Sequence, residues 1–284
     1  MPKTAYDTAK IGIYINDIVK ASSSSFYLAM RLLPKHKKDA MFAVYAFCRQ
    51  IDDIADEPAP IEVKKQRLND WAIAINDIYA GKEPAYNPVA LYLKDVCKEF
   101  SLPKEEFLEL IRGMEMDTHD GLNPPSLDML RLYCRRVAGA VGVLSIHIFG
   151  AVDDKSQRFA IALGEALQLT NILRDTKEDF DMGRIYLPKE LLLSSGIGDI
   201  LPTEMLSHPA IGKVREKLAD MAELRYTEAK MLITPENQKA LHPAIMMMNI
   251  YHKILDKMRK QGWEKTSPKV RLNKMHMLWL ALRS

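Results

Sequence analysis

The chain has 284 residues, of which 48% are apolar and 27% charged, the balance of a globular protein that can bury a large core. Its 40 basic and 37 acidic residues are interspersed, so the formal net charge of +3 gives no basic patch and excludes a nucleic-acid partner. The N-terminus lacks the apolar run of a signal peptide, and the apolar stretch 137–152 is shorter than the ~20 residues of a membrane span. We therefore expect a cytoplasmic protein whose membrane contact is at most peripheral.

Apolar residues recur at helical spacing along almost the whole chain, and no run of five or more residues alternates as a strand does. Prolines and glycines separate the helical runs. In chain order, the predicted helices lie near residues 23–33, 37–56, 61–80, 89–99, 104–119, 126–149, 155–181, 209–232 and 236–260. Ser126 and Thr203 are expected to be N-cap residues. Because no break resembles an interdomain linker, we predict one all-α domain over residues 1–284.

The second predicted helix ends in a cluster of aspartates within FCRQIDDIAD, residues 47–56. Tyr45, Arg49, Asp52 and Asp56 recur at helical spacing and share one face. Like charges one turn apart on a helix repel by about 0.2–0.5 kcal/mol per pair. The cluster is therefore either a solvated acidic face balanced by the neighbouring arginine or a binding site that needs several carboxylates.

A second acidic cluster lies in LQLTNILRDTKEDFDMGRIYLP, residues 167–188. Asn171, Asp175 and Asp179 are spaced by four residues and form one stripe, with Gln168 one turn earlier. Carboxylates on otherwise apolar helices are costly unless they are paired or bound to metal. Mg²⁺ typically takes one or two carboxylates together with phosphate oxygens of a substrate. Two such clusters facing each other across a cavity predict a site for Mg²⁺ and diphosphate.

A di-iron carboxylate site, the other metal site considered, is disfavoured because the chain has no Glu-x-x-His pair.

Two other segments each leave two interpretations open. The serines of SSSSFY, residues 22–27, begin a predicted helix, where hydroxyls and free N–H groups either bind an anion or only cap the helix. YCRRVAGAVG, residues 133–142, places small residues on a helix, either for tight helix packing or to keep a groove open for a long apolar chain.

The three segments FCRQIDDIAD, YCRRVAGAVG and LQLTNILRDTKEDFDMGRIYLP resemble the signature segments of the squalene/phytoene synthase family. The resemblance runs from about Ser22 to Arg283. The flanking segments SSFYLAMRLLP, GMEMD and VRLNKMHMLWLALR are most similar to those of bacterial members on the route to hopanoids. This resemblance implies an all-α isoprenoid synthase fold, a helical bundle around a central active-site cavity.

The resemblance also implies roles for individual residues. The metal-binding positions, which would hold Mg²⁺ or alternatively Mn²⁺ against diphosphate, match Asp52, Asp56, Asn171, Asp175 and Asp179. Catalytic roles fall on the four aspartates of this set and on Tyr133. The positions that contact diphosphate match Ser23, Ser25, Arg49, Arg174, Arg184 and Tyr251, and Asp53 is counted with the substrate-binding residues. The positions near the reacting carbons or the prenyl chains match Phe26, Tyr45, Tyr133, Val137, Val141, Gln168 and Tyr186.

The implied activity is the head-to-head condensation of two molecules of farnesyl diphosphate to presqualene diphosphate, with diphosphate released. Phytoene synthase, dehydrosqualene synthase and NADPH-dependent squalene synthase are alternatives, and a catalytically silent assembly protein is the alternative outside enzymes. Because both aspartate motifs are intact, the sequence favours an enzyme. No Gly-x-Gly-x-x-Gly is present, so we expect no nicotinamide cofactor. The expected partners are downstream enzymes of the squalene pathway. The segment MLWLALR, residues 277–283, either touches a membrane or packs as a terminal helix.

Overall fold

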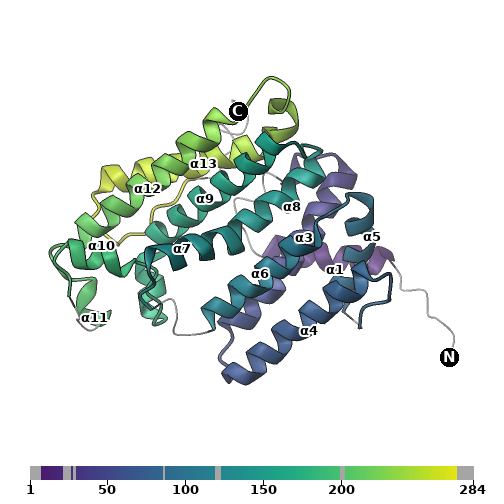
Figure 1. Cartoon of the computed structure of the whole chain (residues 1–284), viewed down its shortest axis with the longest axis horizontal. Coiled ribbons are helices and arrows are strands. Elements are labelled where there is room, and N and C mark those ends of the chain that lie inside the picture. The colour runs from purple at the N-terminus through teal and green to yellow at the C-terminus, as the bar shows by residue number, and fades with distance from the viewer. Residues whose placement is uncertain are drawn as a thin grey trace.

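A computed structural model describes residues 8–21, 27, 30–85, 87–118, 123–198 and 202–273. Within these ranges every regular element is a helix, which confirms the all-α prediction (Figure 1). The elements are α1 Thr8–Ala21, α3 Lys35–Asp56, α4 Ile61–Tyr79, α5 Pro88–Glu99, α6 Lys104–Asp117, α7 Leu127–Cys134, η2 Arg135–Gly139, α8 Ala140–Phe149, α9 Asp154–Asp181, α10 Lys189–Ser194, α11 Pro202–Met205, α12 Ile211–Met231 and α13 Gln238–Gln261.

The predicted helices agree with the observed ones to within a few residues, except at three places. The run predicted at 23–33 lies largely outside the described residues. α1 was not predicted, and α10 and α11 are too short to show a helical repeat. Ser126 caps α7 as predicted, since its side chain accepts a hydrogen bond from the Met129 N–H at 3.2 Å. The prediction for Thr203 was wrong, because this residue lies inside α11 and α12 begins after Ala210.

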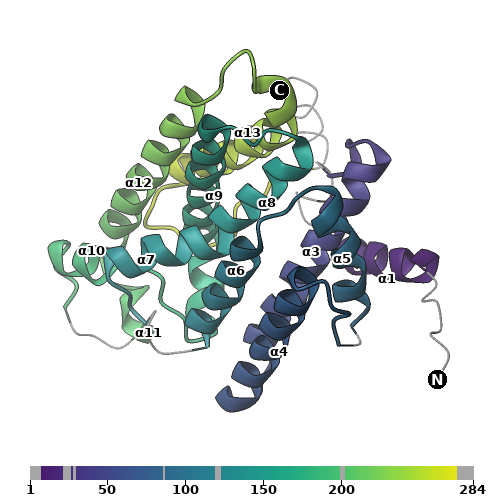
Figure 2. The ribbon, with the colours of Figure 1, turned by 45° about the vertical axis from the view of Figure 1, so that its right-hand side comes forward.

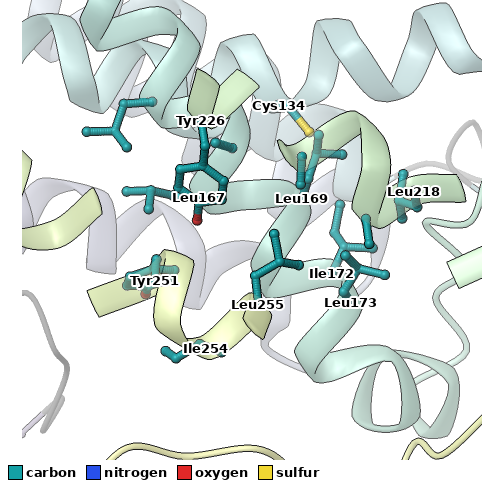
Figure 3. Close-up of a cluster of buried hydrophobic side chains, with 14 of the residues drawn as sticks. Cys134, Leu167, Leu169, Ile172, Leu173, Leu218, Tyr226, Tyr251, Ile254 and Leu255 are labelled. Atoms are coloured by element: carbon teal, nitrogen blue, oxygen red, sulfur yellow. The ribbon is translucent and has the colours of Figure 1, made fainter. Parts of the chain in front are cut away.

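The helices form two hydrophobic cores that meet along η2 and α8. In Figure 1, α1 and α3–α6 group on one side of the molecule, and α9, α12 and α13 group on the other. Phe47 lies in the N-terminal core, where its ring meets those of Trp71 and Phe107 edge to face. Figure 3 shows side chains of the C-terminal core: Leu167, Leu169, Ile172 and Leu173 from α9, Leu218 and Tyr226 from α12, and Tyr251, Ile254 and Leu255 from α13. Val137 of η2 packs against both cores.

The run α7–η2–α8, Leu127–Phe149, passes between these cores (Figure 2). With 23 residues, it is the one helix of the described ranges that is long and apolar enough to cross a membrane by length and composition. Half of its most apolar stretch is buried inside the protein, and it packs against α6 and α9. These contacts agree with the prediction of a buried core helix. Residues 135–139 form one wider π-helical turn, a feature that often accompanies functional sites.

Two glycines allow this helix to cross α9 in direct contact. A Cβ atom on Gly142 would lie 2.5 Å from the carbonyl oxygen of Ala160. A Cβ atom on Gly164 would lie 2.6 Å from the carbonyl oxygen of Ala138. Tight helix packing therefore accounts for both glycines, at a helix-propensity cost of about 0.5–1 kcal/mol each. Ala138, Gly142 and Gly164 also line the cavity described next, and a groove for a long apolar chain stays a prediction.

Candidate active site

A cavity of about 340 Å³ lies between the two cores, walled by α3, η2, α8, α9 and α13. Its wall is mainly apolar, with Phe149, Phe159 and Met247 among the largest side chains. Asp52 of α3 and Asn171 of α9 both line it, so residues of the two predicted clusters meet at this one cavity. Six of the predicted site residues contribute to the wall: Tyr45, Asp52, Val137, Val141, Gln168 and Asn171.

The first cluster is held by an arginine of its own helix. Arg49 Nη1 lies 3.1 Å from Asp52 Oδ2, and the Arg49 guanidinium also forms an ion pair with Asp53. The side chains of Arg49 and Asp52 are 44% and 46% exposed. Desolvation raises the pKa of Asp52 to about 6, and the neighbouring charge of Asp56 adds to this effect. The arginine therefore compensates the carboxylates of this cluster only in part.

The second cluster is held by cations from two parts of the chain. Arg174 donates to both oxygens of Asp175, with Nε at 2.8 Å from Oδ1 and Nη2 at 2.6 Å from Oδ2. Lys269, which follows α13, places Nζ 2.7 Å from the same Oδ1. Burial opposes ionisation of Asp175, but these two cations lower its pKa overall. The Arg174 guanidinium also lies 5.9 Å from the centre of the Tyr251 ring.

Asp179 differs from Asp175 in its surroundings. Desolvation raises the pKa of Asp179 to about 7, and the charge of Asp175 raises it further. Lys177 does not join this stripe, because it pairs with Asp181 on the exposed side of α9 at 2.6 Å. The Asp181 side chain is thus solvated, whereas that of Asp179 is desolvated.

A single arginine connects the two clusters. Arg184, three residues beyond α9, places Nη1 2.7 Å from Asp56 Oδ1 and donates through Nη2 to the carbonyl oxygen of Ala55 at 3.3 Å. A second, more polar cavity of about 450 Å³ lies beside this contact and is lined by Asp56, Arg184 and Tyr186, among others. The ends of α3 and α9 therefore face each other at close range.

Asp117, the last residue of α6, was missed by sequence reasoning. The hydroxyl groups of Tyr133 and Tyr186 donate to its two oxygens at 2.8 and 2.7 Å. The two rings stack with their centres 5.3 Å apart. Burial raises the pKa of Asp117, although the tyrosine hydrogen bonds act against this rise. Burial and the charge of Asp117 raise the pKa of both tyrosines, so both keep their protons.

The two clusters offer carboxylate and amide oxygens, the donor type that hard cations prefer. Across the described ranges, no three His, Cys, Asp or Glu side chains are grouped closely enough to hold a metal ion by themselves. Asn171 Oδ1 is buried and, among the described residues, has no hydrogen-bond partner. A buried acceptor without a partner is costly, which favours a ligand at this position. The carboxylate of Asp52 lines the same cavity as Asn171, and both are oxygen donors of the hard type that Mg²⁺ prefers.

Some predicted residues cannot be placed, and others were not anticipated. Ser23, Ser25 and Phe26 lie outside the described residues. The signal for Asp117 was present in the segment GMEMD, which ends in this residue, but no helical spacing marked it. Lys269 had no signal at all, because only the tertiary fold brings it to Asp175.

The structure is similar to the crystal structure of a dehydrosqualene synthase in complex with ligand, with a TM-score of 0.81 and 32% sequence identity. The match covers 98% of this chain and 96% of that one. The fold and its cavity thus define the class, the helical isoprenoid synthases.

The sequence profile described as Squalene/phytoene synthase matches residues 19–276, so the chain belongs to the squalene/phytoene synthase family of prenyltransferases. A presqualene diphosphate synthase of Zymomonas mobilis is 43% identical over 265 residues, which cover 93% of this chain and 89% of that protein. A presqualene diphosphate synthase of Sinorhizobium fredii is 36% identical over 94% of this chain and 95% of its own length. The resemblance stated from the sequence is confirmed.

Proposed function

We propose that this protein condenses two molecules of farnesyl diphosphate head to head into presqualene diphosphate. The observation that carries the proposal is the apolar cavity lined by both aspartate-motif helices, in a chain that two presqualene diphosphate synthases match over almost its whole length. One diphosphate and one proton leave while the carbon skeletons join and close a cyclopropane. The reaction is redox-neutral, so it needs no nicotinamide cofactor.

The diphosphate end of the site contains the charged residues. Asp52, Asp56, Asn171, Asp175 and Asp179 would hold Mg²⁺, or Mn²⁺ in its place, and the bound metal neutralises the charge of the leaving diphosphate. Arg49, Arg174 and Arg184 lie at the same clusters and are placed to donate to diphosphate oxygens. The unpartnered oxygen of Asn171 supports this assignment.

The apolar part of the cavity protects the allylic cation. Side chains such as Val137, Val141 and Phe159 keep water from the cation once the first diphosphate has left. The Tyr45 ring lines the same cavity, where an aromatic face would stabilise positive charge. The second farnesyl diphosphate then attacks C1 of the cation through its double bond and keeps its own diphosphate.

The released diphosphate is the base that we propose for the final proton loss. The sequence left two candidates, diphosphate and the nearby tyrosines. Because burial and Asp117 raise the pKa of Tyr133 and Tyr186, a phenolate base is disfavoured. Asp117 instead orients the two hydroxyl groups, and the arginines keep the released diphosphate close to the reacting carbons.

We further propose that the protein works in the cytoplasm and touches membranes only peripherally, handing its product to squalene-pathway enzymes. The substrate and the product both combine long apolar chains with a charged head, which favours work near a lipid surface. The segment MLWLALR lies outside the described residues, so its role stays a prediction. Flotation with anionic lipid vesicles should show weak binding that is lost when residues 275–284 are deleted. Unfolding of the deletion variant would indicate that the segment packs on the protein.

The direct test is an incubation of the purified protein with labelled farnesyl diphosphate and Mg²⁺, with and without NADPH. We expect presqualene diphosphate in both reactions. Squalene on addition of NADPH, dehydrosqualene without it, or a forty-carbon product from geranylgeranyl diphosphate would each identify a different member of the family. Absence of any product would favour the assembly protein.

A further inference from the structure

Lys269 occupies the second aspartate cluster although it belongs to neither motif. Its Nζ atom lies 2.7 Å from Asp175 Oδ1 and 3.3 Å from Glu178 Oε1. Arg174 already donates to both oxygens of Asp175. One carboxylate of the proposed metal site is therefore surrounded by two cations of its own chain, and one of these cations comes from outside α9.

The segment that carries Lys269, residues 262–273, is anchored on both sides of it. Arg215 of α12 is 2% exposed and donates to the carbonyl oxygens of Trp263 and Lys265. The same guanidinium donates to the carbonyl oxygen of Leu173 in α9 at 2.8 Å. After Lys269, the side chain of Leu272 is buried in the C-terminal core. A buried arginine that donates to three backbone carbonyl oxygens thus fixes this segment against α9. Its contact on α9, Leu173, is two residues from Asp175.

Asp175 cannot use the same oxygen for Lys269 and for a metal ion. With a metal ion on this oxygen, the lysine ammonium would have to leave it. Glu178 Oε1 already lies 3.3 Å from Nζ, and diphosphate oxygens bound at the same cluster would be new acceptors. The flexible four-carbon side chain of the lysine can cover such a distance while the anchored backbone stays in place. Arg174, in contrast, is bound to both oxygens of the residue next to it and has less freedom to leave.

We propose that Lys269 is a diphosphate-binding residue, which neutralises Asp175 in the metal-free protein and transfers to the diphosphate when the metal takes its place. The inference rests on the proposed function, since it requires a diphosphate at the second cluster. It predicts two effects of opposite sign. Lys269 competes with the metal in the free protein, and it strengthens binding of diphosphate once the metal is present.

Isothermal titration calorimetry on the full chain measures both effects, first with Mn²⁺ alone and then with inorganic diphosphate at saturating Mn²⁺. For Lys269→Met we expect about two- to fivefold tighter binding of Mn²⁺ alone, the size of a partly exposed ion pair, since the Lys269 and Asp175 side chains are 27% and 22% exposed. Binding of diphosphate should weaken about tenfold or more, the size of a hydrogen bond between charged groups. Lys269→Arg, which keeps the charge, should restore diphosphate binding.

Lys265→Met is the matched control, because Lys265 is exposed on the same segment and its loss changes the net charge equally. The control should bind both ligands as the wild type does. If Lys269→Met and Lys265→Met behave alike, or if both titrations weaken together in Lys269→Met, Lys269 is only structural and the inference is wrong. If the wild type itself binds no diphosphate with Mn²⁺, the proposed function fails together with the inference. A thermal melt of Lys269→Arg and Lys269→Met confirms that both variants are folded.

Discussion

The aspartate clusters of α3 and α9 contain similar residues in different surroundings. In the α3 cluster the Asp52 side chain is 46% exposed and pairs with an arginine of its own helix. In the α9 cluster the Asp175 side chain is 22% exposed and contacts both Arg174 and Lys269. Under the proposed function, two identical substrates would therefore meet unequal charged environments. A condensation in which one substrate ionises and the other keeps its diphosphate needs such an inequality.

The clusters are nevertheless coupled. Arg184, which follows α9, binds Asp56 of α3. Asp117 lies near both, since the charge of Asp117 contributes to the raised pKa of Asp52 and of Asp179. The two clusters thus form one site with two unequal halves. Substitutions in each half and at the link between them should differ in their effects.

The largest effect is expected from removing one metal ligand in either half. Asp52→Asn and Asp175→Asn should each lower turnover by about 10³-fold or more, because ionisation of the diphosphate depends on charge neutralisation by both clusters. Release of diphosphate at saturating Mg²⁺ measures the loss. Asp181→Asn, on the exposed face of α9, is the control and should leave turnover unchanged. Near-normal turnover in either of the first two variants would contradict the metal assignment.

The link between the halves is tested at Asp117. Asp117→Ala leaves two buried tyrosine hydroxyl groups without their acceptor, and each such loss costs about 1–3 kcal/mol. Urea denaturation should show this decrease in the free energy of unfolding, and turnover should fall as the tyrosines lose their orientation. Asp117→Asn keeps one acceptor oxygen and should be less damaging in both measurements. An unchanged stability of Asp117→Ala would show that the tyrosines find other partners.

The close crossing that shapes the cavity between the halves depends on Gly164. Gly164→Ala forces a Cβ atom against the Ala138 carbonyl and should destabilise the protein by about 1–3 kcal/mol. Gly12→Ala is the matched substitution in α1, where a Cβ would meet no atom of the described residues within 4 Å. This control should gain about 0.5–1 kcal/mol from the better helix propensity of alanine. Thermal melting of both variants checks the contrast, and equal melting temperatures would contradict the tight packing.

The smallest effect distinguishes the halves by pH. A carboxyl whose folded pKa is raised destabilises the fold when it is ionised, so this cost is present above the folded pKa and absent below the ordinary value of 3.8. In the presence of a chelator, Asp179→Asn should therefore stabilise the protein by about 1 kcal/mol at pH 8 and not at pH 4. The gain in the free energy of unfolding should increase as the pH rises from 4. It should level off near pH 7 for Asp179→Asn and near pH 6 for Asp52→Asn. Identical pH profiles in urea denaturation would show that the two halves are equivalent.

The sequence predicted what depends on helical spacing. The stripes through Asp52 and Asp175 were visible because residues four apart share a helix face, and the Ser126 cap was visible from its position before an apolar run. It did not predict contacts that only the packing of distant segments creates. Asp117 and Lys269 reach the site from α6 and from the segment after α13, at positions with no periodic signal. The π-helical turn at 135–139, which packs against α6 and α9, likewise had no signal in the spacing of apolar residues.

The central claim, that two unequal halves ionise only one of two identical substrates, is tested by the stoichiometry of diphosphate release. Farnesyl diphosphate labelled in its diphosphate group is mixed with enzyme and Mg²⁺ at more than two substrates per enzyme, the reaction is stopped at an early time, and free and carbon-bound label are separated. The account predicts one inorganic diphosphate for every two substrates consumed, with half of the label retained in the product. Complete release of the label, two diphosphates per pair of substrates, would contradict it.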